Sequence, residues 1–176
     1  MQNKFSTRML AEIGVAVALA VVLNFLKLWR MPQGGSVSLE MLPIFVVAFR
    51  WGLGAGIFGG LAYGLLQLMF GAYVIHPVQL IMDYPLPYMV LGVAGIFKIR
   101  KDEIIQPLKM FWAVVVASIL RLIIHILSGA IFFGSYAPEG QNVWVYSTVY
   151  NATFLIPTTI VTYVVVMIVM KALERE

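Results

Sequence analysis

The chain has 176 residues, of which 61% are hydrophobic and only 11% are charged. With a mean hydropathy of +0.93, it has too few polar side chains to cover a soluble globule of this size, so the sequence predicts an integral membrane protein. The absence of cysteine excludes disulfides and thiolate metal sites, and two histidines are too few for a multi-histidine centre. The net charge of +4 comes mostly from bases between apolar runs, a pattern of membrane topology rather than of nucleic-acid binding.

Six apolar segments are long enough, or nearly long enough, to cross a bilayer, which takes about 20 residues of helix. They cover residues 9–29, 38–50, 53–71, 78–97, 110–134 and 147–170. The first lacks a small-residue cleavage site, so we interpret it as a retained helix rather than a signal peptide. We expect an all-α integral membrane protein of the cell membrane, with a six-transmembrane-helix bundle forming one domain over residues 1–176.

The second segment is too short to span the bilayer unaided, and it follows a loop that breaks helix. Met31-Pro-Gln-Gly-Gly-Ser36 precedes it, and Pro43 lies near its start. Irregular backbone at membrane depth persists only where it is buried in protein or lines a cavity. Loop 30–40 is therefore either a lid that folds over a site or an ordinary external loop, and both interpretations stay open.

Basic residues predict the orientation of the bundle. In a six-span arrangement one side carries Lys4, Arg8, Arg50, Lys98, Arg100, Lys101, Lys109, Lys171 and Arg175. The other side carries Lys27 and Arg30. By the positive-inside rule both termini are cytoplasmic, and loops 30–38, 72–77 and 135–146 face outward.

Polar side chains gather in the last two spans. In the fifth span Arg121, His125, Gly129 and Phe133 recur every four residues, so they share one stripe of a helix. An ionisable group at bilayer depth indicates a binding site or a transport path. For His125 the alternative is a neutral ring bonded to a neighbouring helix.

Arg121 needs a carboxylate partner, because an unpaired guanidinium at this depth is costly. The candidates are Asp83, Glu40 and Glu12. We expect Arg121 to form a structural ion pair rather than to contact a ligand.

The fourth and sixth spans add further polar groups. Asp83 and Tyr84 precede Pro85, which bends a helix and can aim a neighbouring carboxylate at a cavity. A buried carboxylate suits a cationic or amine-bearing ligand. Tyr146 and Asn151 lie at the outer end of the sixth span, where asparagine can both donate to and accept from a heterocycle edge.

Motifs of ATP hydrolysis and of common enzymes are missing. The sequence contains no G-x-x-x-x-G-K-[ST], H-E-x-x-H or G-x-S-x-G. We therefore expect no enzymatic activity, no cofactor and no resident metal.

The motifs that remain resemble one family. They are Met31-Pro-Gln-Gly-Gly-Ser-Val-Ser38, Phe49-Arg-Trp-Gly52, His76-Pro-Val-Gln79, Asp83-Tyr84, Ser128-Gly-Ala-Ile-Phe-Phe-Gly-Ser-Tyr-Ala-Pro138, Val145-Tyr-Ser147 and Tyr150-Asn-Ala-Thr153. Over nearly the whole chain the sequence resembles the thiamine-specific substrate-binding component of energy-coupling-factor (ECF) transporters. In that family the subunit captures the vitamin outside a bacterial cell. It then docks on one transmembrane coupling subunit with two ATPases.

The resemblance implies a substrate site. It would include Asp83, at a position where the family commonly has glutamate, together with Tyr84, His125, Gly129, Phe133, Tyr146 and Asn151. Asn151 and Tyr146 would bond the aminopyrimidine of thiamine. Phe133 stands where some relatives have a tryptophan that stacks on the ligand, so Trp144 or Phe132 is a candidate for an additional ring.

The first span carries the other implied surface. Gly14 and Ala18 are four residues apart, as are Ala16 and Ala20, and small residues at this spacing let helices approach closely in lipid. The resemblance implies that Gly14 and Ala18 dock on the coupling subunit, whereas intramolecular packing is the default without it.

The resemblance implies that the chain binds thiamine tightly and that release requires the separate ATPases. Two alternatives remain from the residues: an S component for another vitamin, and a proton-coupled transporter that uses Asp83, Arg121 and His125 as a relay. An intramembrane enzyme based on His125 and Asp83 lacks a nucleophile or metal.

Overall fold

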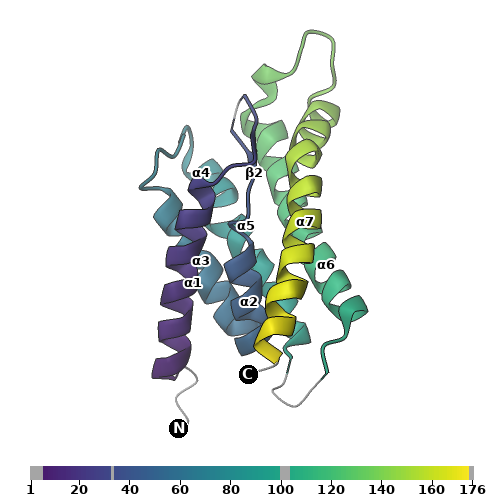
Figure 1. Ribbon diagram of the computed structural model, residues 1–176. Helices are drawn as coiled ribbons and strands as arrows, with labels where there is room; N and C mark the ends of the chain where they lie inside the picture. The colour runs from purple at the N-terminus through teal and green to yellow at the C-terminus, as the bar shows by residue number, and fades with distance from the viewer. Residues whose placement is uncertain (1–5, 33, 100–103, 175–176) are drawn as a thin grey trace.

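The structure is a computed structural model that describes residues 6–32, 34–99 and 104–174. The orientation-setting residues Lys4, Arg100, Lys101 and Arg175 lie outside this range. Long helices run side by side (Figure 1). The elements in chain order are α1 (Thr7–Phe25), β1 (Trp29–Arg30), β2 (Ser36–Val37), α2 (Leu42–Trp51), α3 (Leu53–Gln67), α4 (Pro77–Asp83), α5 (Pro85–Met89), η1 (Val90–Phe97), α6 (Pro107–Phe132), η2 (Gly134–Tyr136) and α7 (Val143–Glu174).

Four segments of the described chain have the length and composition of membrane-spanning helices. They are Thr7–Phe25, Pro77–Phe97, Pro107–Phe132 and Val143–Leu173. The apolar helices α2 and α3 are shorter, with 10 and 15 residues. The prediction of an all-α membrane protein is confirmed. Figure 1 shows that α1 begins and α7 ends at the same end of the bundle, which we call the terminal end.

One face of α1 packs against α2 and α3. The helix begins after Ser6, whose hydroxyl accepts a hydrogen bond from the Met9 amide at 3.2 Å and so caps the first turn. Its buried residues, Met9, Ile13, Val17 and Ala20, follow helical spacing. Glu12 lies near the terminal end and accepts hydrogen bonds from Arg50 Nε at 3.0 Å and Trp51 Nε1 at 2.8 Å.

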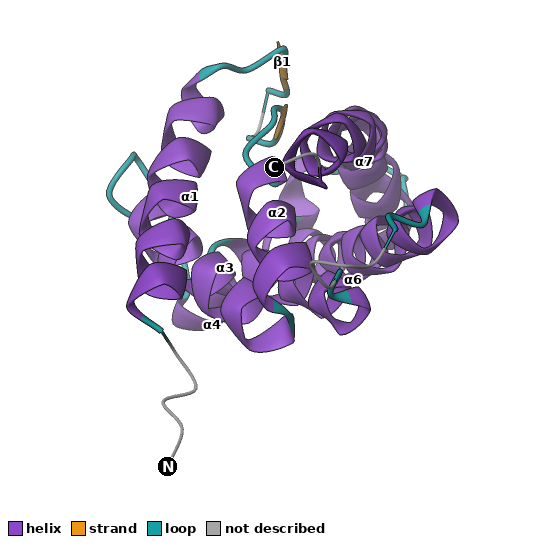
Figure 2. Ribbon diagram, turned by 60° about the horizontal axis from the view of Figure 1, so that its bottom comes forward, coloured by secondary structure: helices purple, strands orange, loops and turns teal. Residues whose placement is uncertain are grey.

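Loop 30–40 contains a short antiparallel hairpin. Trp29 pairs with Val37 and Arg30 with Ser36, and the turn uses the positive φ of Gly34 and Gly35. After β2 the chain runs in irregular conformation to α2, which therefore begins partway down the bundle (Figure 1). Figure 2 shows the hairpin between the end of α1 and α7.

The predicted fourth span, residues 78–97, is not one helix. It is broken at Tyr84 into α4 and α5, and its last eight residues form the 3-10 helix η1. Proline causes the break, because Pro85 has no amide hydrogen for the helical bond to the preceding turn. The interruption places Asp83 and Tyr84 at a bend.

Glycines let α3 lie directly against this broken span. A Cβ on Gly60 would collide with the backbone carbonyl of Tyr88, and one on Gly64 would come within 2.6 Å of Pro85 Cα. The third span was predicted to extend to residue 71, but α3 ends at Gln67. After it, three backbone hydrogen bonds of the i to i−3 type form turns that lead to Gly71, which has a positive φ.

Helices α6 and α7 form an antiparallel pair. Ser147 Oγ donates to the carbonyl of Ile126 at 2.9 Å, and Tyr163 donates to the carbonyl of Pro107 at 3.3 Å at the other end. The apolar core fills the terminal half of the bundle with Phe45, Phe49, Leu91, Val114 and Val166, all at most 1% exposed. The opposite half contains a cavity.

Candidate functional site

A cavity of about 360 Å³ lies between the hairpin and the helices, in the half of the bundle away from the terminal end. That volume suits one small organic molecule. Its lining comes from the end of α1, the hairpin, the loop after α3, the bend at Asp83, and the parts of α6 and α7 away from the terminal end. The lining residues are Asn24, Lys27, Gly34, Gly35, Ser36, Glu40, Gln67, Phe70, Gly71, Ala72, Tyr73, Asp83, Tyr84, Tyr88, Arg121, His125, Gly129, Phe133, Tyr136, Tyr146, Ser147, Tyr150, Asn151 and Phe154.

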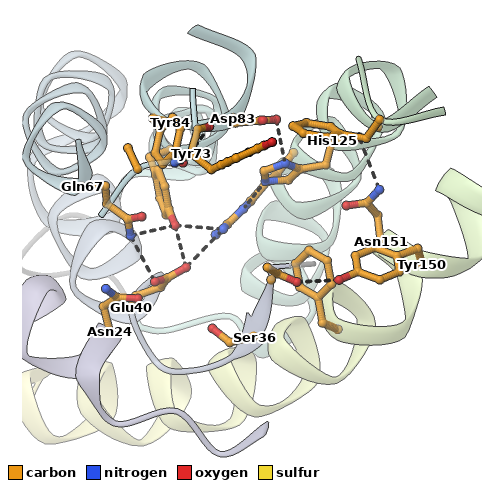
Figure 3. Close-up of a pocket in the computed structure, with 18 of the residues that line it drawn as sticks. Asn24, Ser36, Glu40, Gln67, Tyr73, Asp83, Tyr84, His125, Tyr150 and Asn151 are labelled. Atoms are coloured by element: carbon orange, nitrogen blue, oxygen red, sulfur yellow. Dashed lines mark hydrogen bonds and ion pairs between the residues drawn. The ribbon is translucent and has the colours of Figure 1, made fainter. Parts of the chain in front are cut away.

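All seven residues singled out as a site from the sequence lie on this lining. They come from three separate parts of the chain: Asp83, Tyr84, His125, Gly129, Phe133, Tyr146 and Asn151. The stripe on α6 therefore faces the bend of the fourth span and the start of α7, as Figure 3 shows for Asp83, His125 and Asn151.

Asp83 and His125 face each other in the wall of the cavity. Asp83 Oδ1 lies 3.9 Å from His125 Nδ1, and its other oxygen accepts a hydrogen bond from Gln79 Nε2. Among the described residues, no lysine or arginine forms an ion pair with Asp83. The carboxylate is thus held in place but keeps a negative charge beside the cavity.

Asn151 is fixed by hydrogen bonds across the α6–α7 interface. Its Nδ2 donates to the carbonyl of Ser147 at 2.9 Å and to that of His125 at 3.3 Å. In Figure 3 its side-chain oxygen points toward the cavity. With both amide hydrogens used inside the protein, Asn151 presents an acceptor and not a donor to a ligand. A Cβ at Gly129 would collide with Ser147 Oγ, so this close approach needs glycine.

Arg121 pairs with Glu40, one of its three candidate partners. Arg121 Nη2 lies 3.2 Å from Glu40 Oε1, and the two residues are 4% and 6% exposed. The expected structural ion pair is therefore present. Asp83 and Glu12 are engaged elsewhere, with His125 and Arg50.

A polar network surrounds this ion pair, and sequence reasoning did not anticipate it. Glu40 accepts hydrogen bonds from Tyr88 at 2.6 Å, Tyr63 at 2.9 Å and Gln67 at 3.3 Å. Arg121 also lies over the Tyr88 ring, with its Cζ 4.3 Å from the centroid, a cation–π geometry. Glu40 precedes α2, and Tyr63 and Tyr88 belong to α3 and α5. No local motif can signal contacts between such distant positions.

Aromatic rings form the outer wall of the cavity. The Phe133 ring lies beside both Tyr73 and Tyr136, with centroids 6.2 and 6.1 Å away. Tyr146 and Tyr150 of α7 add two further rings, 5.8 Å apart. The Tyr73 side chain beside it raises the pKa of Tyr136 above its usual value, so Tyr136 stays neutral at neutral pH. These neutral π-faces can surround an organic cation.

The two extra rings considered from the sequence do not line the cavity. Trp144 is 48% exposed, and Phe132 stacks on His76 with centroids 5.2 Å apart. Tyr73 and Tyr136 occupy the place beside Phe133 instead. The sequence reasoning missed them because one lies in a loop and the other in η2, outside the helical stripe.

The hairpin contacts α7 along the rim of the cavity. Tyr150 donates to the carbonyl of Gly34 at 2.7 Å, and Gly35 lies directly against the Phe154 ring. Thr158 reaches the carbonyl of Ser36 at 3.5 Å. The loop is therefore not an isolated external loop, because Gly34, Gly35 and Ser36 all line the cavity.

The two small-residue pairs on α1 face opposite ways. Gly14 and Ala18 are exposed, and a Cβ on Gly14 would meet no atom within 4 Å. Ala20 is fully buried, and Ala16 is partly buried against the core. Packing within the protein thus accounts for Ala16 and Ala20 but not for Gly14 and Ala18.

The fold and the cavity define a small multi-pass membrane protein with a site for one organic molecule. The profile of the family described as "Thiamine transporter protein (Thia_YuaJ)" matches residues 10–176. The chain belongs to this family, and so it is a membrane transport protein rather than an enzyme.

Relatives of known name agree with this assignment. The chain is 40% identical to the thiamine transporter ThiT of Bacillus subtilis (strain 168), over 99% of this chain and 95% of that protein. It is 28% identical to the thiamine transporter ThiT of Lacticaseibacillus paracasei, over 94% and 88% of the two chains. A solved structure of ThiT from Listeria monocytogenes superposes with a TM-score of 0.82 at 29% identity, covering 93% of each chain. The resemblance found in the motifs is confirmed, and the chain is a multi-pass protein of the bacterial cell membrane.

Proposed function

We propose that this chain is the thiamine-binding subunit of an ECF transporter and captures extracellular thiamine for uptake. Its membership of the thiamine transporter family supports thiamine as the ligand. The observation that carries the proposal is a carboxylate with no lysine or arginine partner among the described residues, set beside aromatic rings in one cavity.

The charge balance of the cavity favours a cation. Glu40 and Arg121 neutralise each other. Lys27 lies beyond the end of α1 and is exposed. Asp83 therefore supplies the net negative charge in the depth of the cavity, and it attracts the fixed positive charge of a thiazolium.

The aminopyrimidine of thiamine binds between α6, α7 and Asp83. Its exocyclic amino group is a donor, and both the Asn151 side-chain oxygen and the Asp83 carboxylate are acceptors. Tyr146 contributes a ring and a hydroxyl, His125 contributes a ring nitrogen, and Gly129 lets Ser147 and Asn151 of α7 lie close against α6. Tyr84 carries its hydroxyl beside Tyr73 at the same wall.

The thiazolium lies against the aromatic wall. Phe133 provides a face there, flanked by Tyr73 and Tyr136. Cation–π contact contributes about 0.5 to 2 kcal/mol per ring, with tryptophan the strongest and phenylalanine weaker. In this chain several aromatic rings with moderate cation–π attraction take the place of one tryptophan.

Loop 30–40 acts as the lid of the site. Its contacts with α7 support a closed position, since the Tyr150 hydroxyl holds Gly34 and the Phe154 ring packs on Gly35. Opening of the turn at residues 34–36 requires these contacts, the Thr158 hydrogen bond and the packing of Val37 against Phe154 and Leu155 to separate. The two-residue strands of the hairpin keep the turn together as it moves.

Release of thiamine requires partner proteins. The partners are a transmembrane coupling subunit and two ATPases, because this chain contains no phosphate-binding loop. The exposed Gly14 and Ala18 face of α1 docks on the coupling subunit through close helix packing in lipid. Both termini are cytoplasmic, so the cavity opens to the outside.

Transport in proteoliposomes tests this proposal. The purified chain alone should retain labelled thiamine without accumulating it, and adding the coupling subunit with its two ATPases should give uptake that depends on ATP. The Asp83→Asn variant is the matched control, because it keeps the shape but removes the charge. Uptake by the chain alone at a useful rate would overturn the proposal.

A proton-coupled transporter is the second candidate, and one observation favours it. Asp83, His125, Arg121 and Glu40 form a continuous series of contacts through the bundle, with Arg121 Nε 3.4 Å from His125 Nε2. Such a series resembles a proton relay. Thiamine accumulation that follows an imposed pH gradient and ignores ATP would favour this candidate.

A further inference from the structure

Gln79 is a fully buried polar side chain that lies behind the cavity rather than on it. It belongs to α4, is 0% exposed and is absent from the cavity lining. Its amide nitrogen donates to the carbonyl of Tyr73 at 3.0 Å and to Asp83 Oδ2, and its oxygen accepts from the Ile75 amide at 3.1 Å. Both amide hydrogens and the oxygen are thus in use.

These bonds join two parts of the cavity wall. Asp83 stands one helical turn after Gln79, whereas Tyr73 and Ile75 belong to the loop that connects α3 to α4. Because Gln79 occupies Asp83 Oδ2, the other oxygen of the carboxylate is left facing His125. The rotation of the Asp83 carboxylate is therefore set from behind by Gln79.

Tyr84 also holds the loop that contains Tyr73. The Tyr73 amide donates to the Tyr84 hydroxyl at 2.7 Å, while the Tyr73 carbonyl accepts from Gln79. Both backbone groups of Tyr73 are therefore bound by side chains of the fourth span. This places the Tyr73 ring in the cavity wall beside Phe133. Figure 3 shows Tyr73, Tyr84 and Asp83 together on one side of the cavity.

We propose that Gln79 is a positioning residue for ligand binding, which orients the Asp83 carboxylate and fastens the Tyr73 loop to it without touching the ligand. The inference rests on the proposed function, because it takes thiamine as the probe. The one buried amide of Gln79 thus positions both the charged group of the site, Asp83, and one of its aromatic rings, Tyr73. Loss of this amide lets the carboxylate rotate and the Tyr73 ring move away together.

The first test is the Gln79→Met variant, which keeps the side-chain length and removes all three hydrogen bonds. Thiamine Kd, measured by calorimetry on purified protein, should rise about tenfold or more, as expected for losing a hydrogen bond that orients a charge. Val166→Ala is the control, because Val166 is fully buried in the core of the terminal half and outside the cavity lining. It should lower thermal stability while leaving Kd within about twofold of wild type.

A double-mutant cycle separates positioning from general stability. If Gln79 acts through Asp83, then Gln79→Met should cost much less affinity in an Asp83→Asn background than in wild type, because the charge to be oriented is gone. Additive losses in the cycle would overturn the proposal and leave Gln79 with a structural role only.

The Gln79→Glu variant provides a signature that loss of stability cannot imitate. At pH 8 two carboxylates face each other and repel, so the variant should bind thiamine weakly relative to wild type. Two carboxylates that share a site take up one proton more readily than either does alone, so by about pH 5.5 the introduced carboxyl group can again donate to Asp83. The other titratable and charged groups around this pair are the same in both proteins, namely His125, Tyr73, Tyr84, Arg121 and Glu40. The ratio of variant Kd to wild-type Kd therefore isolates the effect.

The ratio should fall as the pH decreases from 8 to 5.5. A ratio that stays constant or rises would contradict the proposal, as would an unchanged Kd in folded Gln79→Met. If Gln79→Met does not yield monodisperse protein, the pH series on Gln79→Glu decides alone. Absence of thiamine binding by the wild-type protein would overturn the proposed function, which is a different result from failure of any Gln79 variant.

Discussion

Separating the Glu40–Arg121 pair should destabilise the protein more than removing both charges. Each charge is nearly inaccessible to water, and each is neutralised mainly by the other. The variants to compare are Glu40→Gln, Arg121→Gln and the double variant that carries both substitutions. The sum of the two single losses in stability should exceed the loss in the double variant.

The magnitude follows from the contacts. Removing one member of a buried ion pair costs about 3 to 5 kcal/mol, because the other charge stays buried without compensation. In Glu40→Gln the single amide oxygen can accept from only one of Tyr63 and Tyr88, which bond different carboxylate oxygens, so one hydrogen bond is lost together with the charge opposite Arg121. For a protein of this size, 3 kcal/mol corresponds to a decrease in melting temperature on the order of 10 °C.

Thermal unfolding of the four purified proteins in detergent provides the assay. The two single variants should each melt on the order of 10 °C below wild type. The double variant should melt above the value expected from adding both decreases. Single variants that melt within about 2 °C of wild type, or strict additivity in the double, would refute the argument that this pair is buried and mutually dependent.

Four other substitutions test the site and the packing. Asp83→Ala and Asn151→Ala should each weaken thiamine binding by about 1.5 kcal/mol or more in a calorimetric titration, and unchanged affinity in folded protein would remove them from the site. Phe133→Trp should strengthen binding by about 0.5 to 1 kcal/mol in the same titration, since tryptophan is the better cation–π face, and weaker binding would contradict the placement of the thiazolium. Gly60→Ala should lower the melting temperature, because the added methyl group meets the Tyr88 carbonyl. An unchanged melting temperature would mean that α3 and α5 are not in close contact.

The helices were largely predictable because the membrane imposes their length and composition. Six apolar segments corresponded to α1, α2, α3, the broken fourth span, α6 and α7. Pro85 predicted a bend in the fourth span, but not that its second half would be a 3-10 helix. This 3-10 segment lies directly against the first part of α3, with Gly92 against the backbone of Gly56 and Ile57, contacts that are distant in sequence.

The cavity was predictable only in part. Residues on one helical stripe, such as His125 and Gly129, could be grouped by spacing, and Asp83 and Asn151 stood out as polar groups in apolar spans, whereas their roles toward a particular ligand came from the resemblance. Glu40 was one of three candidate partners for Arg121, and nothing local distinguishes them. Glu40 is the partner of Arg121 because the chain between β2 and α2 brings its carboxylate to Tyr63 and Tyr88.

The loop residues were the least predictable. Tyr73 lies outside any regular element, and its place in the wall is set by hydrogen bonds with Gln79 and Tyr84 rather than by helical periodicity. Loop 30–40 was open between two interpretations. Its contacts with Tyr150 and Phe154 connect residues more than 100 positions apart in the chain.

Ligand selectivity tests the central claim most directly. Calorimetric titration of the purified protein with thiamine, riboflavin and biotin should give saturable one-to-one binding for thiamine and no measurable heat for the other two. The same titration on Asp83→Asn should show weaker binding of thiamine. Binding of riboflavin or biotin in preference to thiamine, or no binding of thiamine at all, would contradict the account.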